Sequence, residues 1–234
     1  MSSEYSFRMQ TAAKKIAVLG ASRGLGRALK LEISANEANS KAGGEIRGAQ
    51  FLLAARNEEK LGLLKSQQDL TFACDFTKTE DQARLLNALI EFQPTHIFYV
   101  AGGGPYGRFE SKKWADHAWA LELNFNWPAR MLHTIMSHLP EYKNLKQIVF
   151  VGSAIAGQGP DPMAASYAAA KHALRGLITS VRKENPSLDI RLYEPGYMAT
   201  DMLPPSAWPR QQGLAKSPED EARALWQWAQ STLD

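Results

Sequence analysis

Tyr167 and Lys171 are the two side chains whose spacing most directly suggests chemistry. Residues four apart share one face of a helix, so the spacing places an ammonium beside a phenol. A free tyrosine has a pKa of ~10, and half ionisation near pH 7 requires about 4 kcal/mol. One unit charge at about 4 Å supplies roughly that much at an effective dielectric of about 20. The pair therefore predicts a tyrosine that donates and accepts a proton near neutral pH.

A glycine-rich segment indicates what this proton transfer is coupled to. Gly20, Gly24 and Gly26 follow an expected strand and precede an expected helix, the setting of a nucleotide-binding loop. Glycine permits a tight turn and close approach of the backbone to a pyrophosphate, which rests on the helix N-terminus. The spacing G-x-x-x-G-x-G also suits a purely structural turn. The nucleotide interpretation points to hydride exchange with a dinucleotide.

Two arginines favour NADP over NAD as that dinucleotide. An acidic residue after the second strand usually binds the ribose 2′-hydroxyl, but Arg56 follows the second strand here. Arg23 lies inside the glycine loop. Two guanidinium groups suit bidentate contacts with a 2′-phosphate. The alternative is that each arginine is a solvated loop charge.

The elements that must position these residues alternate between strand and helix. This pattern predicts one doubly wound α/β domain, a parallel sheet of about six strands with helices on both faces. The expected strands are 15–19, 50–54, 70–74, 96–100, 147–151 and 188–193. The expected helices are 25–38, 58–65, 79–92, 113–139 (with a kink or joint at Pro128), 166–183 and 219–230. We expect a flexible tail over 1–14, a turn over 41–48 and a substrate loop over 197–216.

Composition narrows the class of protein. A chain of 234 residues with 44% hydrophobic and 22% charged residues suits one globular domain, and a formal charge of +3 does not indicate nucleic-acid binding. The single cysteine, Cys74, excludes an internal disulfide and is interpreted as a packed small residue. We find no apolar run of about 20 residues and no secretory signal, so a cytoplasmic protein without a membrane span is expected. The histidine spacing predicts no metal site.

Together these motifs resemble the short-chain dehydrogenase/reductase family, of the ordinary single-domain type with a Rossmann fold. The glycine loop, Ser153, the Tyr-x-x-x-Lys pair, and Pro195-Gly196 followed by Thr200 occur in the family's order. The resemblance extends from residue 15 to about 202. Any one motif is weak, and the ordered set is specific.

The resemblance implies roles for four catalytic residues. Tyr167 would be the general acid in reduction and the base in oxidation. Lys171 would lower the tyrosine pKa and hold the nicotinamide ribose. Ser153 would hydrogen-bond the substrate carbonyl oxygen, and Asn124 would support a water-linked proton path to the lysine.

The resemblance also implies a cofactor site. Asp75 would contact the adenine, and Pro195, Gly196 and Thr200 would position the nicotinamide amide. The implied cofactor-binding residues are Gly20, Ser22, Arg23, Gly24, Leu25, Gly26, Arg56, Asp75, Ala101, Gly102, Lys171, Pro195, Gly196 and Thr200. A homodimer through 113–139 and 166–183, or a higher homo-oligomer, is the family expectation.

Two departures from the family pattern stand out. Val100 occupies a position where the family commonly has asparagine before alanine and glycine. No strand is evident after the helix expected over 219–230, which limits the sheet to six strands.

The sequence thus predicts an NADP(H)-dependent oxidoreductase acting on a small-molecule carbonyl or alcohol. One alternative is an NADPH-binding regulatory or sensor protein without turnover. Another is an epimerase or dehydratase acting on a nucleotide sugar, although those relatives typically have a longer chain and a different glycine spacing. The aromatic and methionine content suggests only that part of the substrate is apolar.

Overall fold

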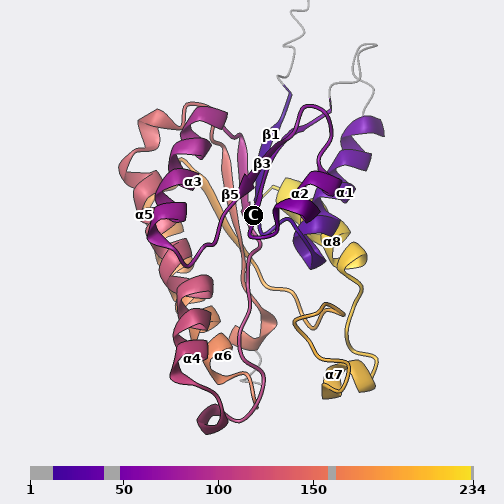
Figure 1. Cartoon of the computed structure of the whole chain (residues 1–234). Coiled ribbons are helices and arrows are strands. Elements are labelled where there is room, and N and C mark those ends of the chain that lie inside the picture. The colour runs from indigo at the N-terminus through magenta and orange to yellow at the C-terminus, as the bar shows by residue number, and fades with distance from the viewer. Residues whose placement is uncertain (1–12, 40–47, 158–161, 233–234) are drawn as a thin grey trace, which may run out of the picture.

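The computed structural model describes residues 13–39, 48–157 and 162–232 and contains a six-stranded parallel sheet (Figure 1). The strand order is β3-β2-β1-β4-β5-β6, and every pairing is parallel. The strands are β1 (Lys15–Leu19), β2 (Gln50–Ala55), β3 (Leu70–Ala73), β4 (His96–Tyr99), β5 (Gln147–Val151) and β6 (Asp189–Tyr193). The predicted doubly wound fold is confirmed.

Helices cover both faces of this sheet. Figure 1 shows α3, α4, α5 and α6 on one side and α1, α2 and α8 on the other. The helices are α1 (Gly24–Asn39), α2 (Glu58–Leu64), α3 (Thr79–Phe92), α4 (Trp114–Leu121), α5 (Trp127–Ser137), α6 (Ala165–Glu184), α7 (Trp208–Gln211) and α8 (Pro218–Gln230). None of the helices in the described ranges is long and apolar enough to cross a membrane.

The core has two layers because each strand alternates its side chains between the two faces. In β5, Ile148 and Phe150 pack toward α3, α5 and α6, whereas Val149 and Val151 pack toward α1 and α8. A parallel sheet covered on both faces needs apolar residues at successive positions. The strands therefore appear in the sequence as continuous apolar runs.

The order of the strands reverses at β1, which lies between β2 and β4. In open α/β sheets, ligands bind in the crevice outside the carboxyl ends of the strands at such a switch point. The glycine loop follows β1, and the Val100–Gly104 stretch follows β4, so both border this crevice.

The helix expected over 113–139 is divided where the sequence placed a joint. α4 ends at Leu121, a π-helical turn spans Glu122–Asn126, and α5 begins at Trp127. Pro128 in the first turn of α5 would clash with the carbonyl four residues earlier in a regular helix. The wider turn just before Pro128 relieves that clash, and Asn124 within this turn is fully buried.

The C-terminal helix α8 completes the second layer in place of a further strand. Ser217 begins it as N-cap, its hydroxyl accepting a 3.0 Å hydrogen bond from the Asp220 amide. Trp226 of α8 packs against Phe98 of β4. The tail predicted over 1–14 and the turn predicted over 41–48 lie almost wholly outside the described residues.

Candidate active site

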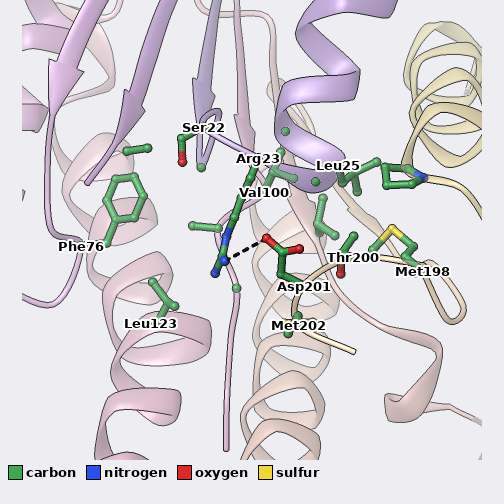
Figure 2. Close-up of a pocket in the computed structure, with 18 of the residues that line it drawn as sticks. Ser22, Arg23, Leu25, Phe76, Val100, Leu123, Met198, Thr200, Asp201 and Met202 are labelled. Carbon is green, nitrogen blue, oxygen red and sulfur yellow. Dashed lines mark hydrogen bonds and ion pairs between the residues drawn. The ribbon is translucent and has the colours of Figure 1, made fainter. Parts of the chain in front are cut away.

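A cavity of about 440 Å³ lies at the switch point of the sheet (Figure 2). It is bordered by the glycine loop, the end of β2, the segment after β4, and residues 198–202. Of the predicted cofactor residues it includes Gly20, Ser22, Arg23, Gly24, Leu25, Gly26, Arg56, Ala101, Gly102, Lys171 and Thr200. Segments far apart in the sequence thus form one binding space.

The glycine loop is built so that only glycine fits at two positions. Gly20 has φ of +108°, and a Cβ there would lie 2.6 Å from the Ala101 amide nitrogen. A Cβ on Gly26 would lie 2.2 Å from the Gly20 carbonyl oxygen. This close packing brings the N-terminus of α1 to the cavity, where its free N–H groups favour an anion.

Basic side chains line the same cavity. Arg23 points across it and forms an ion pair of 3.4 Å with Asp201, drawn as a dashed line in Figure 2. Arg56 and Lys60 also line it, and the Arg56 guanidinium carbon lies 5.9 Å from the centre of the Trp119 ring. The cavity therefore combines a backbone anion site with several cations.

Asn57 and Lys60 are cavity residues that sequence analysis missed. Asn57 is the N-cap of α2, and its side-chain oxygen accepts a 2.8 Å hydrogen bond from the Lys60 amide. The cap places Lys60 in the first turn of α2, beside Arg56 at the end of β2. An N-cap asparagine directly after Arg56 was a signal in the sequence that could have indicated this arrangement.

A second cavity of about 500 Å³ adjoins the first. Tyr167, Met198, Thr200 and Met202 line both cavities. Ser153, Pro195 and Gly196 line only the second. The predicted loop over 197–216 supplies much of its wall, and it is closed at its base by hydrogen bonds of Ala199 and Tyr197 with Lys216.

Tyr167 and Ser153 both line the second cavity. Burial raises the pKa of Tyr167 to about 12, and the Ser153 side chain opposes this only in part. The expectation that Lys171 lowers the phenol pKa toward neutrality is wrong for this structure. The tyrosine is instead held as a protonated donor.

Lys171 lies one turn further along α6 and is almost fully buried, with 2% of its surface exposed. Its Nζ donates a 2.7 Å hydrogen bond to the Val151 carbonyl oxygen at the end of β5. The same atom lies 5.5 Å from the centre of the Tyr167 ring. Burial lowers the pKa of Lys171 to about 7. The predicted helical juxtaposition is present, but the ammonium is directed to the backbone.

Asn124, predicted as a catalytic residue, lies in the π-helical turn and lines neither cavity. It is fully buried, and its Nδ2 donates to the carbonyl oxygens of Gly103 and Ala120 at 2.6 Å each. Its Oδ1 accepts a 3.3 Å bond from the Gly103 amide. These contacts hold the segment after β4, and the water-linked path from Asn124 to Lys171 stays a prediction.

Asp75 is the one predicted cofactor residue that lines neither cavity. Its carboxylate accepts hydrogen bonds from the amide and hydroxyl of Thr77 at 3.0 and 2.8 Å. The adjacent Cys74 is buried, and burial raises its pKa to about 12, as suits a packed thiol. In the described part of the chain, no three His, Cys, Asp or Glu residues are grouped closely enough to hold a metal ion.

Arg175 of α6 hydrogen-bonds the turn that follows Ser153. Nη1 of Arg175 donates a 2.8 Å hydrogen bond to the Ala156 carbonyl oxygen, and its Nε lies 3.4 Å from a carboxylate oxygen of Glu194. The Ala154 amide donates at 2.9 Å to the carbonyl of Pro195, the residue after Glu194. Arg175 thereby ties the Ser153 turn to the loop after β6.

We expect Arg175→Ala to lower kcat about 10-fold to 100-fold, because a small displacement of a positioned donor has that cost. Affinity for the dinucleotide, measured by fluorescence titration, should stay within about twofold, since Arg175 lines neither cavity. Arg175→Lys should restore part of kcat, and Arg182→Ala on the same helix is the matched control. An unchanged kcat in Arg175→Ala would contradict the positioning role.

The family model described as short chain dehydrogenase matches residues 14–209. The chain belongs to the short-chain dehydrogenase family. The match includes both cavities and nearly all of the residues that line them.

Individual family members are distant relatives. The chain is 25% identical over 201 residues to "11-beta-hydroxysteroid dehydrogenase" of Pinus massoniana, covering 81% of this chain and only 52% of that protein. It is 27% identical over 203 residues to "NADPH-dependent pterin aldehyde reductase" of Arabidopsis thaliana, covering 82% and 78%. The crystal structure of the KRED1-Pglu enzyme superposes with a TM-score of 0.78 at 22% identity, covering 95% and 97%, which supports the fold alone.

Proposed function

We propose that this chain transfers a hydride between NADP(H) and a carbonyl or alcohol substrate, with Tyr167 as general acid and base. The observation that carries the proposal is that Tyr167 lines both cavities. One cavity has a glycine cradle and cationic side chains, and the other has Ser153 beside the tyrosine hydroxyl. A cofactor in the first and a substrate in the second would meet at Tyr167.

The residues of the chain supply acid catalysis and orientation for this reaction. When bound, the reduced nicotinamide supplies the hydride. As negative charge develops on the carbonyl oxygen, the hydroxyls of Ser153 and Tyr167 donate hydrogen bonds to it, and Tyr167 transfers its proton to that oxygen. The raised pKa of Tyr167 keeps the proton in place until the charge develops. Oxidation of an alcohol uses the same groups in reverse.

The glycine loop fits a pyrophosphate because a Cβ at Gly20 or Gly26 would fill the cradle. Arg23, Arg56 and Lys60 support NADP as the dinucleotide, since guanidinium groups bind phosphate bidentately. The relative from Arabidopsis thaliana is named for NADPH dependence, in agreement with this choice.

We expect NADPH to bind at least about 10-fold more tightly than NADH, because charged hydrogen bonds contribute about 1.5–3 kcal/mol each. Fluorescence titration of the purified protein with each nucleotide measures this. Arg56→Ala should remove most of the preference by weakening NADPH alone, and Arg84→Ala, at an exposed arginine of α3, should leave it intact.

Equal or NADH-favoured binding would overturn the assignment of the arginines to the 2′-phosphate. Absence of binding to either nucleotide would contradict the dinucleotide function itself. Binding without turnover of any carbonyl would favour the sensor alternative.

A homodimer through α4, α5 and α6 and a cytoplasmic location complete the proposal. The dimer is the family expectation, and sedimentation as a monomer at micromolar concentration would contradict it. The location can be tested by imaging a fluorescent fusion in cells.

A further inference from the structure

The second cavity differs from the first in its charge. The described side chains that line it carry no charge, and their polar groups are hydroxyls, among them those of Ser153 and Tyr167, and the indole N–H of Trp208. The first cavity contains Arg23, Arg56, Lys60 and Asp201. Cationic side chains therefore line the first cavity, where a polyanionic cofactor fits. None of the described residues that line the second cavity is a cation.

Charged residues close in sequence to the residues that line the second cavity are already paired with other groups of the protein. Arg210 donates to the carbonyl oxygens of Leu203 and Thr200, at 2.8 and 2.5 Å, and so braces the loop from within. Asp201 pairs with Arg23, and Arg175 binds the Ala156 carbonyl and Glu194. An anionic group that enters the second cavity would lose its hydration, and these arginines already bind other groups of the protein.

The wall itself is aromatic and aliphatic. The rings of Tyr197 and Trp208 meet edge to face, with centres 5.5 Å apart and planes at 74°. Trp208 and Leu214 line the cavity yet keep 44% and 52% of their surfaces exposed, so apolar surface continues from the cavity outward. A volume of about 500 Å³ accommodates fused rings beside a carbonyl group.

We propose that the second cavity selects neutral carbonyl compounds with an aromatic ring system and rejects their anionic counterparts. The proposal rests on the proposed function, because the selected carbonyl would react at Tyr167. It specifies a substrate class through two features, the apolar wall and the absence of a free cation among the described lining residues.

A matched set of ketones tests this selection. The probes are 2-acetylnaphthalene, 6-acetyl-2-naphthoate and the methyl ester of that acid, titrated calorimetrically into the full chain with and without NADP. The neutral ketone and the ester should bind at least about 100-fold more tightly than the carboxylate. Equal binding of the carboxylate, or binding of none of the three, would overturn the proposal. Turnover is measured separately, so binding without reduction contradicts only the proposed function.

Adding a cation should weaken the selection against the carboxylate. Leu214→Lys should improve the affinity of the carboxylate relative to the ester about twofold to fivefold, through a partly exposed ion pair. Leu31→Lys, at a leucine of α1 with 42% of its surface exposed, is the matched control and should leave the ratio unchanged. If circular dichroism shows that Leu214→Lys is unfolded, Met202→Lys replaces it. An unchanged ratio in the folded variant would overturn the proposal.

Discussion

Tyr167→Phe is expected to lower kcat/KM for carbonyl reduction about 1,000-fold, within the range that general acid catalysis supplies. The change removes only the phenol hydroxyl and keeps the ring that lines both cavities. The dissociation constant for NADPH should therefore stay within about twofold of the unmodified protein. Steady-state kinetics and a fluorescence titration on the same preparation separate the two effects.

Tyr142→Phe is the matched control. The Tyr142 hydroxyl is buried without a hydrogen-bond partner, and the residue lies beyond α5 and lines neither cavity. Its removal should leave kcat unchanged and should not destabilise the fold, because an unsatisfied buried hydroxyl is itself unfavourable. Wild-type reduction by Tyr167→Phe across a panel of carbonyls would refute the assigned mechanism.

The pH dependence distinguishes a raised tyrosine pKa from a lowered one. Reduction needs the protonated phenol, and with a pKa of about 12 this form persists through pH 6 to 10, so Tyr167 itself should impose no fall in reduction rate. Oxidation needs the phenolate, so its kcat/KM should rise about tenfold per pH unit with no plateau in this range. A plateau of oxidation above pH 7 would instead support a tyrosine pKa near neutrality.

The fold could be predicted from the sequence because its signals are local. The inner strands β1, β2, β4 and β5 are buried on both faces and therefore appear as apolar runs. Gly20, Gly24 and Gly26 could be placed because strand, turn and helix follow one another directly. The joint before α5 was foreseen from Pro128, whose ring excludes a regular helix in the preceding turn.

The electrostatics of the site could not be predicted, since they depend on contacts between distant segments. Helical spacing brings Lys171 near Tyr167, but the Val151 carbonyl that binds its ammonium comes from β5, 20 residues away. Asp75 has a local partner in Thr77, which keeps its carboxylate out of the cavity. The different charges of the two cavities arise only when the loop over 197–216 folds against the glycine loop.

Lys171→Met is expected both to abolish most of the activity and to stabilise the folded protein near neutral pH. A pKa of about 7 in place of 10.5 means that burial disfavours the ammonium by about 5 kcal/mol. Methionine fills a similar volume without a charge and gives up the contact of Nζ with the Tyr167 ring and the charged hydrogen bond to Val151, which contributes about 1.5–3 kcal/mol. The free energy of unfolding at pH 6 should therefore increase by about 2–4 kcal/mol. Reduction should fall at least about 100-fold.

The stabilisation by Lys171→Met should decrease as pH rises, because the pKa of Lys171 is lower in the folded chain than in the unfolded chain. The unfolded chain holds the lysine proton up to pH 10.5, whereas the folded chain releases it near pH 7. Between these values the unfolded state binds more protons, so the unmodified protein gains stability as pH rises. Its deficit relative to Lys171→Met should shrink by about 3 kcal/mol between pH 7 and 9.5. Urea unfolding of both proteins at several pH values measures this difference.

Lys183→Met, at an exposed lysine near the end of the same helix, provides the comparison. Because that side chain is solvated in both states, its replacement should change the free energy of unfolding by less than about 0.5 kcal/mol at every pH. A pH-independent difference for Lys171→Met would show that its ammonium is not desolvated in the fold. Destabilisation at pH 6 would show that the bond to Val151 outweighs the cost of burial. The proposed reaction would then begin from a charged lysine beside Tyr167, the arrangement that the helical spacing alone had suggested.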